Sequence, residues 1–110
     1  MYKYDISKQI EIIKKAIINE VQVKFIYLFG SYAYGKPNKN SDIDIYVIIP
    51  DNNDICLFDI YGNIITYLYD NNVLNAEILF EKESDFKCNK ELYSFQDTIY
   101  KKGTIVYENK

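Results

Sequence analysis

Two aspartates, Asp42 and Asp44, stand two positions apart at the start of an apolar run that extends to Ile49. On a β-strand, side chains two apart point to the same face, so both carboxylates would point the same way with their Cα atoms roughly 6.5 to 7 Å apart. Like charges at this separation repel each other and call for a compensating positive charge. A Mg²⁺ ion would supply it, because this ion takes oxygen ligands and commonly combines one or two carboxylates with substrate phosphates.

Gly30 and Ser31 end an earlier apolar run, residues 23–29, whose β-branched and aromatic residues are typical of a buried strand. A turn that leaves a strand and opens a short helix exposes backbone N–H groups, and such groups bind phosphate. Gly30 has no Cβ and lets the backbone approach a ligand closely, while Ser31 adds a hydroxyl donor. A phosphate cradle and a carboxylate pair on neighbouring strands are the parts that nucleotidyl transfer requires, since that reaction depends on positioning and charge neutralisation.

The joint pattern is a strand, Gly30-Ser31, ten further residues and then Asp42-x-Asp44 on a second strand. It resembles the signature of the DNA polymerase β-like nucleotidyltransferase superfamily, and the chain is most similar to the smallest branch, the minimal nucleotidyltransferase (MNT) family. The resemblance runs from about residue 25 to the end, although the specific motif is confined to residues 30–47. Each piece alone is common: Gly-Ser occurs in many turns, and Ser41-Asp42 could begin a strand on a solvent-facing side.

The resemblance implies a Mg²⁺-dependent nucleotidyltransferase that moves AMP from ATP to an acceptor hydroxyl and releases pyrophosphate. Asp42 and Asp44 would hold two Mg²⁺ ions, while Gly30 and Ser31 would bind the β- and γ-phosphates of the nucleotide. In MNT proteins a carboxylate in a later strand completes the set, and Glu77 lies in a similar apolar frame. Its implied role is to complete the metal site and to orient or deprotonate the acceptor hydroxyl.

Two residues depart from the pattern of the family. Tyr34 stands where many relatives carry a basic residue, so one phosphate or base contact is in doubt; this tyrosine could stack on a nucleobase or simply pack. Glu77 replaces the commoner aspartate and reaches one methylene further, and it could instead be a surface glutamate on a half-exposed strand. Lys36 and Lys39 could add positive charge near a triphosphate, or they could be ordinary solvated loop lysines.

MNT proteins are often paired with a helical HEPN protein, and the pair can act as antitoxin and toxin. The resemblance therefore implies a HEPN-type toxin as the partner, one of its tyrosines as the acceptor, and an antitoxin role for this chain. Two alternatives stay open. One is a non-catalytic MNT antitoxin that neutralises its partner by contact alone, and the other is a nucleotidyltransferase for a small, aminoglycoside-like molecule, although larger relatives that do this carry an extra domain.

Composition excludes several classes of function. The chain has 110 residues and predicts a single domain over residues 1–110 with one core. Its net charge of -3 argues against an extended nucleic-acid binding surface. All 13 basic residues are lysines, so no side chain can form a bidentate guanidinium clamp on phosphate. Histidine is absent, which excludes a histidine-dependent triad and a histidine-ligated zinc site.

Cysteine usage and hydropathy predict a cytoplasmic protein. Cys56 and Cys88 lie 32 positions apart and form neither a disulfide framework nor a Cys-x-x-Cys site, so we expect two free thiols in a reducing compartment. The first residues lack the apolar region of a signal peptide, and no apolar run is long enough to span a bilayer. We therefore expect no membrane segment.

The predicted fold is α/β (α+β), a small mixed sheet with helices packed on it, as in the nucleotidyltransferase core. Apolar periodicity predicts helices over residues 6–20, 55–70 and 91–102 and a short helical turn over 31–34. Alternating or continuous apolar runs predict strands over 23–29, 42–49, 73–80 and 104–107. Residues 81–90 are predicted as a loop with a turn of helix near Phe86.

The same patterns predict which side chains face the core. An isoleucine stripe should pack the first helix on the sheet: Ile6, Ile10, Ile13 and Ile17. One face of the strand over 42–49 is wholly apolar and should be core: Ile43, Ile45, Val47 and Ile49. The last helix should point Leu92, Phe95, Ile99 and Tyr100 inward. Candidate N-caps are Asp5 or Ser7 for the first helix and Asp54 for the second.

Overall fold

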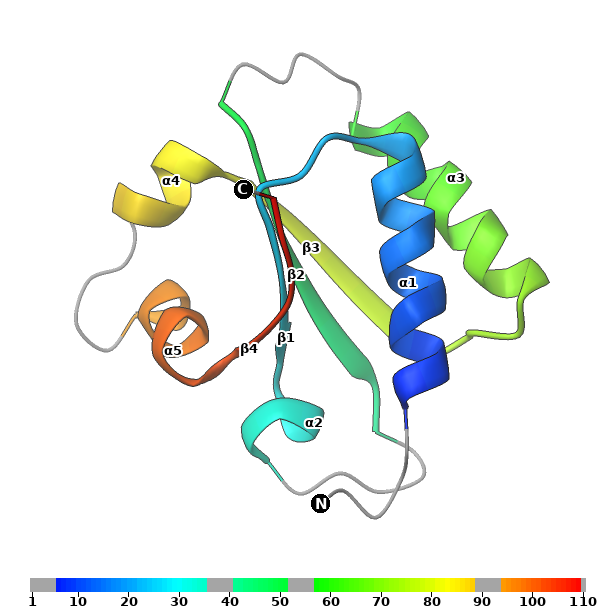
Figure 1. The fold of residues 1–110 in the computed structure, drawn as a ribbon, viewed down its shortest axis with the longest axis horizontal. Coiled ribbons are helices and arrows are strands. Elements are labelled where there is room, and N and C mark those ends of the chain that lie inside the picture. Colours follow the sequence, from blue (N-terminus) through cyan, green and yellow to red (C-terminus); the bar gives the residue numbers. More distant parts are fainter. Residues whose placement is uncertain (1–5, 36–40, 52–56, 89–93, 110) are drawn as a thin grey trace.

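A computed structural model of the chain describes residues 6–35, 41–51, 57–88 and 94–109. These residues form a four-stranded sheet in the order β3-β2-β1-β4, with helices on both faces (Figure 1). The elements in chain order are α1 (Ser7–Glu20), β1 (Phe25–Phe29), α2 (Ser31–Tyr34), β2 (Ile43–Ile49), α3 (Leu57–Asp70), β3 (Ala76–Lys82), α4 (Glu83–Cys88), α5 (Phe95–Lys102) and β4 (Thr104–Glu108). The expected α/β fold with a mixed sheet is confirmed.

Strand β2 lies in the interior of the sheet and sets its register. It runs antiparallel to β1, with Phe29 opposite Asp44, and parallel to β3, with Asp44 opposite Glu77. The far edge is formed by β4, which pairs antiparallel with β1. Because β1 and β2 are antiparallel and β2 and β3 are parallel, the end of β1 meets the beginnings of β2 and β3 (Figure 1). These strand ends form one edge of the sheet, which is distinct from the side edge formed by β4.

Helices α1 and α3 cover one face of the sheet and enclose the larger core (Figure 1). The face of β2 predicted as core is fully buried there, with exposed fractions of 0–1% for Ile43, Ile45, Val47 and Ile49. The isoleucine stripe of α1 packs against this layer as expected, with Ile13 and Ile17 buried and Ile6 and Ile10 partly buried. This layer packs against the face of β2 that is opposite the face carrying Asp44.

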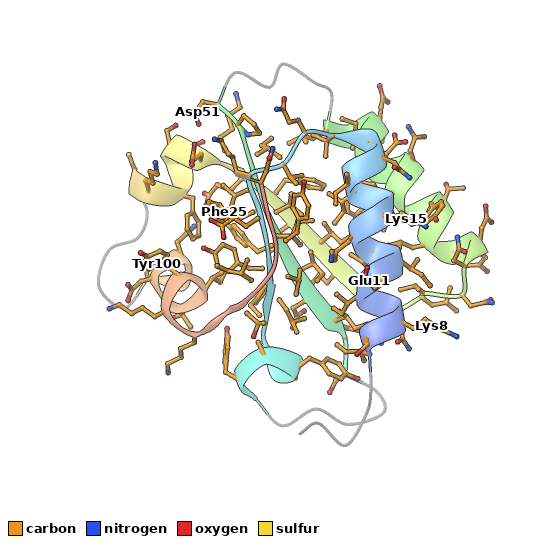
Figure 2. The ribbon with its side chains drawn as sticks, in the orientation of Figure 1. Lys8, Glu11, Lys15, Phe25, Asp51 and Tyr100 are labelled. Atoms are coloured by element: carbon orange, nitrogen blue, oxygen red, sulfur yellow. The ribbon has the colours of Figure 1, made fainter. Side chains whose placement is uncertain are left out.

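Helices α4 and α5 cover the second face, where a smaller aromatic cluster forms. Tyr46 and Phe86 lie 5.7 Å apart between ring centroids, and Tyr27 stacks on Phe86 at 6.0 Å. Phe25 packs against this cluster, whereas Tyr100 lies on the outer side of α5 (Figure 2). Tyr46 therefore lies on the same face of β2 as Asp44. Tyr46 is buried under α4 and α5, whereas Asp44 is only partly buried.

The third strand begins and ends later than predicted: it covers Ala76–Lys82 rather than residues 73–80. Helix α3 stops at Asp70, and Asn72 adopts a positive φ of 64° that turns the chain back. The backbone N–H of Val73 then bonds to the carbonyl of Leu68 at 2.8 Å, so Val73 is buried in a helix-ending turn rather than in a strand. Within residues 76–80 the predicted alternation is confirmed: Ala76, Ile78 and Phe80 lie on one face, and Glu77 and Leu79 on the other.

Three smaller predictions were wrong. The N-cap position of α1 is Ile6, with no side-chain cap, so Ser7 is not the cap. Residues 81–88, predicted as loop, instead extend β3 over 81–82 and form the helix Glu83–Cys88, which confirms only the helical turn predicted near Phe86. Tyr100 is 54% exposed rather than inward, whereas Ile99 is buried as expected.

Some expectations fall on residues outside the described ranges: Asp5, Lys36, Lys39, Asp54, Cys56 and Leu92, and the side chain of Phe95. Cys88 is a free, exposed thiol. None of the helices in the described ranges is long and apolar enough to cross a membrane.

Candidate functional site

Three of the predicted site residues, Gly30, Asp44 and Glu77, meet at one edge of the sheet. Gly30 directly follows β1, whose last residue, Phe29, pairs with Asp44. Asp44 in turn pairs with Glu77 across the parallel β2–β3 ladder, so the two side chains point to the same face. Three segments that are distant in the sequence thus supply a glycine and two carboxylates to one place.

The carboxyl groups of Asp44 and Glu77 are joined by a hydrogen bond. Partial burial, followed by the negative charges of Glu77 and Asp42, raises the pKa of Asp44 from 3.8 to about 6. A hydrogen bond between two carboxyl groups requires that one of them carry a proton. Asp44 therefore takes up a proton at a higher pH than an ordinary aspartate, and a bound cation would displace that proton.

Gly30 lies directly against the carboxylate of Asp44. A Cβ built on Gly30 would overlap Asp44 Oδ2, so any other residue here would force the Asp44 carboxylate to move. Gly30 also has φ 72° and ψ -149°, a conformation that is essentially restricted to glycine. The chain needs glycine here for two separate reasons, close approach and backbone conformation.

Helix α2 begins directly after Gly30, as predicted for a phosphate-binding turn. The N–H groups of Ala33 and Tyr34 bond to the carbonyl of Gly30 at 3.1 and 3.0 Å, which closes the first turn. Tyr32 is buried and anchors this turn to the core, whereas Ser31 is half-buried and Tyr34 is 42% exposed. Ser31 therefore begins a helix at the site edge, where a first-turn N–H and a hydroxyl are suited to a phosphate oxygen.

Asp42 lies just before β2 and is exposed. Its charge reaches Asp44, since it contributes to the raised pKa of that carboxyl group. Within the described ranges, however, no group of three or more acidic or cysteine side chains is gathered closely enough to hold a metal ion. The structure thus brings Asp44 and Glu77 into contact with each other, with Asp42 nearby but outside a three-carboxylate cluster.

The chemistry of these donors fits Mg²⁺. All three side chains offer carboxylate oxygens, the ligand type that Mg²⁺ prefers, and Mg²⁺ is commonly held by only one or two protein carboxylates together with substrate phosphates. The carboxylate of Asp44 occupies the position that a Cβ on residue 30 would take, so it lies directly against the backbone at the start of α2. Asp44, Asp42 and Glu77 are the residues that would hold the ion.

One residue of the site was missed by sequence reasoning. Asn75 donates a hydrogen bond from Nδ2 to the carbonyl oxygen of Ser41 at 3.1 Å, and its own carbonyl accepts one from the N–H of Ile43 at 2.8 Å. These bonds join segments 34 residues apart, and the sequence contains no local pattern that would indicate them. Asparagine before a strand suggests only a turn.

Comparison with known proteins places these residues in a family. The sequence model of the polymerase beta nucleotidyltransferases matches residues 11–110. A Methanocaldococcus jannaschii protein named "Putative protein adenylyltransferase MJ1379" is 46% identical over 55 residues, which cover 50% of this chain and 54% of the relative. The protein adenylyltransferase MntA of Shewanella oneidensis is 48% identical over 44 residues, 40% of this chain and 32% of the relative. The chain thus spans about half or less of these two curated relatives.

Solved structures share the fold. The crystal structure of a mutant toxin–antitoxin pair, MntA–HpeT, contains a chain with a TM-score of 0.62 and 17% identity, over 92% of this chain and 74% of that one. A crystal structure of a toxin–antitoxin with AMP-PNP gives a TM-score of 0.59 and 20% identity over the same shares. At these identities the likeness concerns the fold.

Proposed function

Because the chain belongs to the polymerase β nucleotidyltransferase family, we propose that it transfers AMP from ATP to a hydroxyl group of an acceptor protein. Its named relatives support the minimal (MNT) branch of that family. The observation that carries the proposal is the meeting of Gly30, Asp44 and Glu77 at one edge of the sheet. That edge combines a glycine-led helix start suited to phosphate with carboxylates suited to a divalent cation.

Each residue of this edge has a separate role in the proposed reaction. Gly30 and Ser31 bind the β- and γ-phosphates through backbone N–H groups and the serine hydroxyl. Asp42 and Asp44 hold the cations, and Glu77 completes their binding. Two Mg²⁺ ions, when bound, would neutralise the triphosphate and the developing charge of the leaving group. Cation binding requires the Asp44 carboxyl group to be ionised, so it should weaken as the pH falls below the raised pKa of Asp44, about 6.

Glu77 also orients the acceptor. Its carboxylate accepts the proton of the acceptor hydroxyl as the oxygen of that group forms a bond to the α-phosphorus of ATP. The bond between the α-phosphorus and the bridging oxygen breaks at the same centre, and pyrophosphate leaves with its electrons. Glu77 is exposed, so a hydroxyl from another molecule can reach it.

A protein acceptor is supported by the relatives and by an exposed apolar surface between α3 and the beginning of β3. The Shewanella oneidensis relative is named a protein adenylyltransferase, and the Methanocaldococcus jannaschii relative is named a "Putative protein adenylyltransferase". Tyr69 and Leu74 are 68% and 69% exposed, and they line an apolar hollow of about 140 Å³ at the beginning of β3. Exposed apolar side chains of this size are typical of protein contact surfaces.

We further propose that the acceptor is a tyrosine of a HEPN-type helical toxin, and that modification silences the toxin. The support is the toxin–antitoxin context of the two structural neighbours and the MNT signature of residues 30–47. In this role the chain is an antitoxin, and ATP is the nucleotide donor.

Transfer of label from α-labelled ATP tests the proposal. The full chain is incubated with Mg²⁺, ATP and a HEPN protein co-expressed from the neighbouring gene, and the acceptor is analysed by mass spectrometry. We expect AMP on a tyrosine with the wild type and none with Asp42→Asn or Asp44→Asn. Asp59→Asn removes an exposed aspartate of α3 and serves as the matched control, which should transfer normally. A complex that forms but receives no label from the wild type would refute the enzymatic proposal.

A second candidate is a non-catalytic antitoxin that acts by contact. The exposed position of Asp42 favours it, because Asp42 does not form a three-carboxylate cluster with Asp44 and Glu77 in the described part of the chain. In that case the double variant Asp42→Asn/Asp44→Asn would still neutralise the toxin in a growth assay. Loss of neutralisation in the variant, with complex formation retained, would exclude contact as the mechanism.

A further inference from the structure

Asn75 is bonded to both sequence neighbours of Asp42. Its side-chain Nδ2 donates to the carbonyl oxygen of Ser41, the residue before Asp42, at 3.1 Å. Its backbone carbonyl accepts from the N–H of Ile43, the residue after Asp42, at 2.8 Å. The backbone on each side of Asp42 is therefore held by one residue that enters the neighbouring strand.

Asp42 lies at a position that neither strand pairing nor burial fixes. It precedes β2, so it lies outside the β1–β2 ladder, whose pairs begin at Asp44, and outside the β2–β3 ladder, whose pairs begin at Ile43. Its side chain is exposed, so packing does not fix its rotamer. A carboxylate on an exposed residue outside the paired strands is poorly placed to hold a cation unless other bonds fix its backbone.

We propose that Asn75 is a positioning residue for Asp42: its side-chain amide fixes the Ser41 peptide so that the Asp42 carboxylate is held toward Asp44 and Glu77. The proposal rests on the proposed function, in which Asp42 holds the divalent cation. Asn75 lies two residues before Glu77, so one short segment would both carry one carboxylate and orient another. A neutral amide suits this position because an acidic residue would add a fourth negative charge beside Asp42, Asp44 and Glu77.

The two bonds of Asn75 can be separated by mutation. Asn75→Ala removes the bond to Ser41 but leaves the backbone bond to Ile43, so the register of β2 and β3 should persist. Asn71→Ala is a matched control, because Asn71 also donates its side-chain amide to a backbone carbonyl, that of Tyr67 at 2.8 Å, at the end of α3. A general loss of stability would affect both variants, whereas positioning of Asp42 concerns only the first.

The first test uses the metal-free full chain and backbone ¹⁵N relaxation. We expect the order parameter of the Asp42 amide to fall from about 0.85 to below about 0.6 in Asn75→Ala, while that of Glu77 stays high. Asn71→Ala should leave both residues unchanged. An unchanged order parameter at Asp42 in Asn75→Ala would overturn the proposal, because the amide would then hold nothing.

The second test is a Mg²⁺ titration of ATP binding by calorimetry. We expect Asn75→Ala to raise the Mg²⁺ concentration for half-maximal binding about tenfold, the usual effect of removing a residue that orients a metal ligand. Asn71→Ala should match the wild type. A looser Asp42 with an unchanged Mg²⁺ requirement would also overturn the proposal. If the wild type binds no Mg²⁺-ATP at all, the proposed function fails and the metal-orienting role with it, while relaxation still reports whether Asn75 holds Asp42.

Discussion

Asp44 and Glu77 stand at the same register on two parallel neighbouring strands, and their carboxyl groups share a hydrogen bond. Adjacent carboxylates repel each other when both are ionised, so this contact favours a protonated pair when no cation is bound. The contact therefore lowers the stability of the metal-free fold at neutral pH. It is also the feature that a bound cation would convert into a favourable interaction.

The raised pKa of Asp44 predicts how the metal-free stability depends on pH. The folded-state pKa of about 6 exceeds the ordinary value of 3.8, so the folded chain binds more protons than the unfolded chain between these values. The contribution of Asp44 to stability is therefore present below pH 3.8 and is lost as the pH rises through 6. In EDTA at pH 7.5, we expect Asp44→Asn to be more stable than the wild type by about 1 kcal/mol, after allowance for solvent screening.

Thermal unfolding of both proteins at pH 4 and at pH 7.5 checks this expectation. The advantage of Asp44→Asn should shrink toward pH 4, where Asp44 is protonated in the folded wild type. Added Mg²⁺ should then raise the midpoint of the wild type only. Equal pH profiles for the two proteins would show that the pKa of Asp44 is not raised in the folded chain.

Gly30→Ala should damage both the fold and the site. The new Cβ would overlap Asp44 Oδ2, and alanine disfavours the φ of 72° found at this position. We expect the free energy of unfolding to fall by about 2 kcal/mol or more and ATP binding to be lost. Urea denaturation and calorimetry measure the two effects.

Gly62→Ala is the matched glycine control for Gly30→Ala. Gly62 is exposed in the interior of α3, and a Cβ there would meet nothing within 4 Å. This variant should gain about 0.5–1 kcal/mol in unfolding free energy and bind ATP normally. A destabilised Gly62→Ala would contradict the helical conformation given to α3.

Tyr46→Phe should weaken the junction between the sheet and α5. The hydroxyl of Tyr46 donates to Glu81 of β3 and is also hydrogen-bonded to the side chain of Gln96 in α5. Its loss leaves the half-buried Glu81 without this donor, and we expect a cost of about 1–3 kcal/mol in urea denaturation. Tyr69→Phe, which alters an exposed tyrosine of α3, should change stability by less than about 0.5 kcal/mol.

Local chemistry made much of the site predictable. The spacing of Gly30-Ser31 and Asp42-x-Asp44 predicted two neighbouring strands, and strict alternation predicted that Asp44 would lie on the face opposite Ile43 and Ile45. Both follow from the two-residue period of a strand, which needs no knowledge of distant contacts. The same period placed Glu77 on the face opposite Ala76 and Ile78.

Other features depend on contacts that a linear sequence does not display. Val73 is apolar and was assigned to a strand, but the positive φ of Asn72 folds it back onto α3. The N–H of Ser84 at the start of α4 bonds to Asp51, which lies at the far end of β2 from Asp44 (Figure 2). The bond from Asn75 to Ser41 spans 34 positions. The bonds of Ser84 and Asn75 are tertiary contacts, whereas the turn at Asn72 and Val73 is a local helix-ending motif.

Calorimetric titration of the isolated full chain with ATP, in the presence and absence of Mg²⁺, tests the central claim most directly because it requires no acceptor. We predict Mg²⁺-dependent binding by the wild type and by Asp59→Asn, and loss of this binding in Asp42→Asn and Asp44→Asn. Binding that is absent from the wild type, or that survives in both site variants, would contradict the assignment of this edge of the sheet as a nucleotide- and metal-binding site.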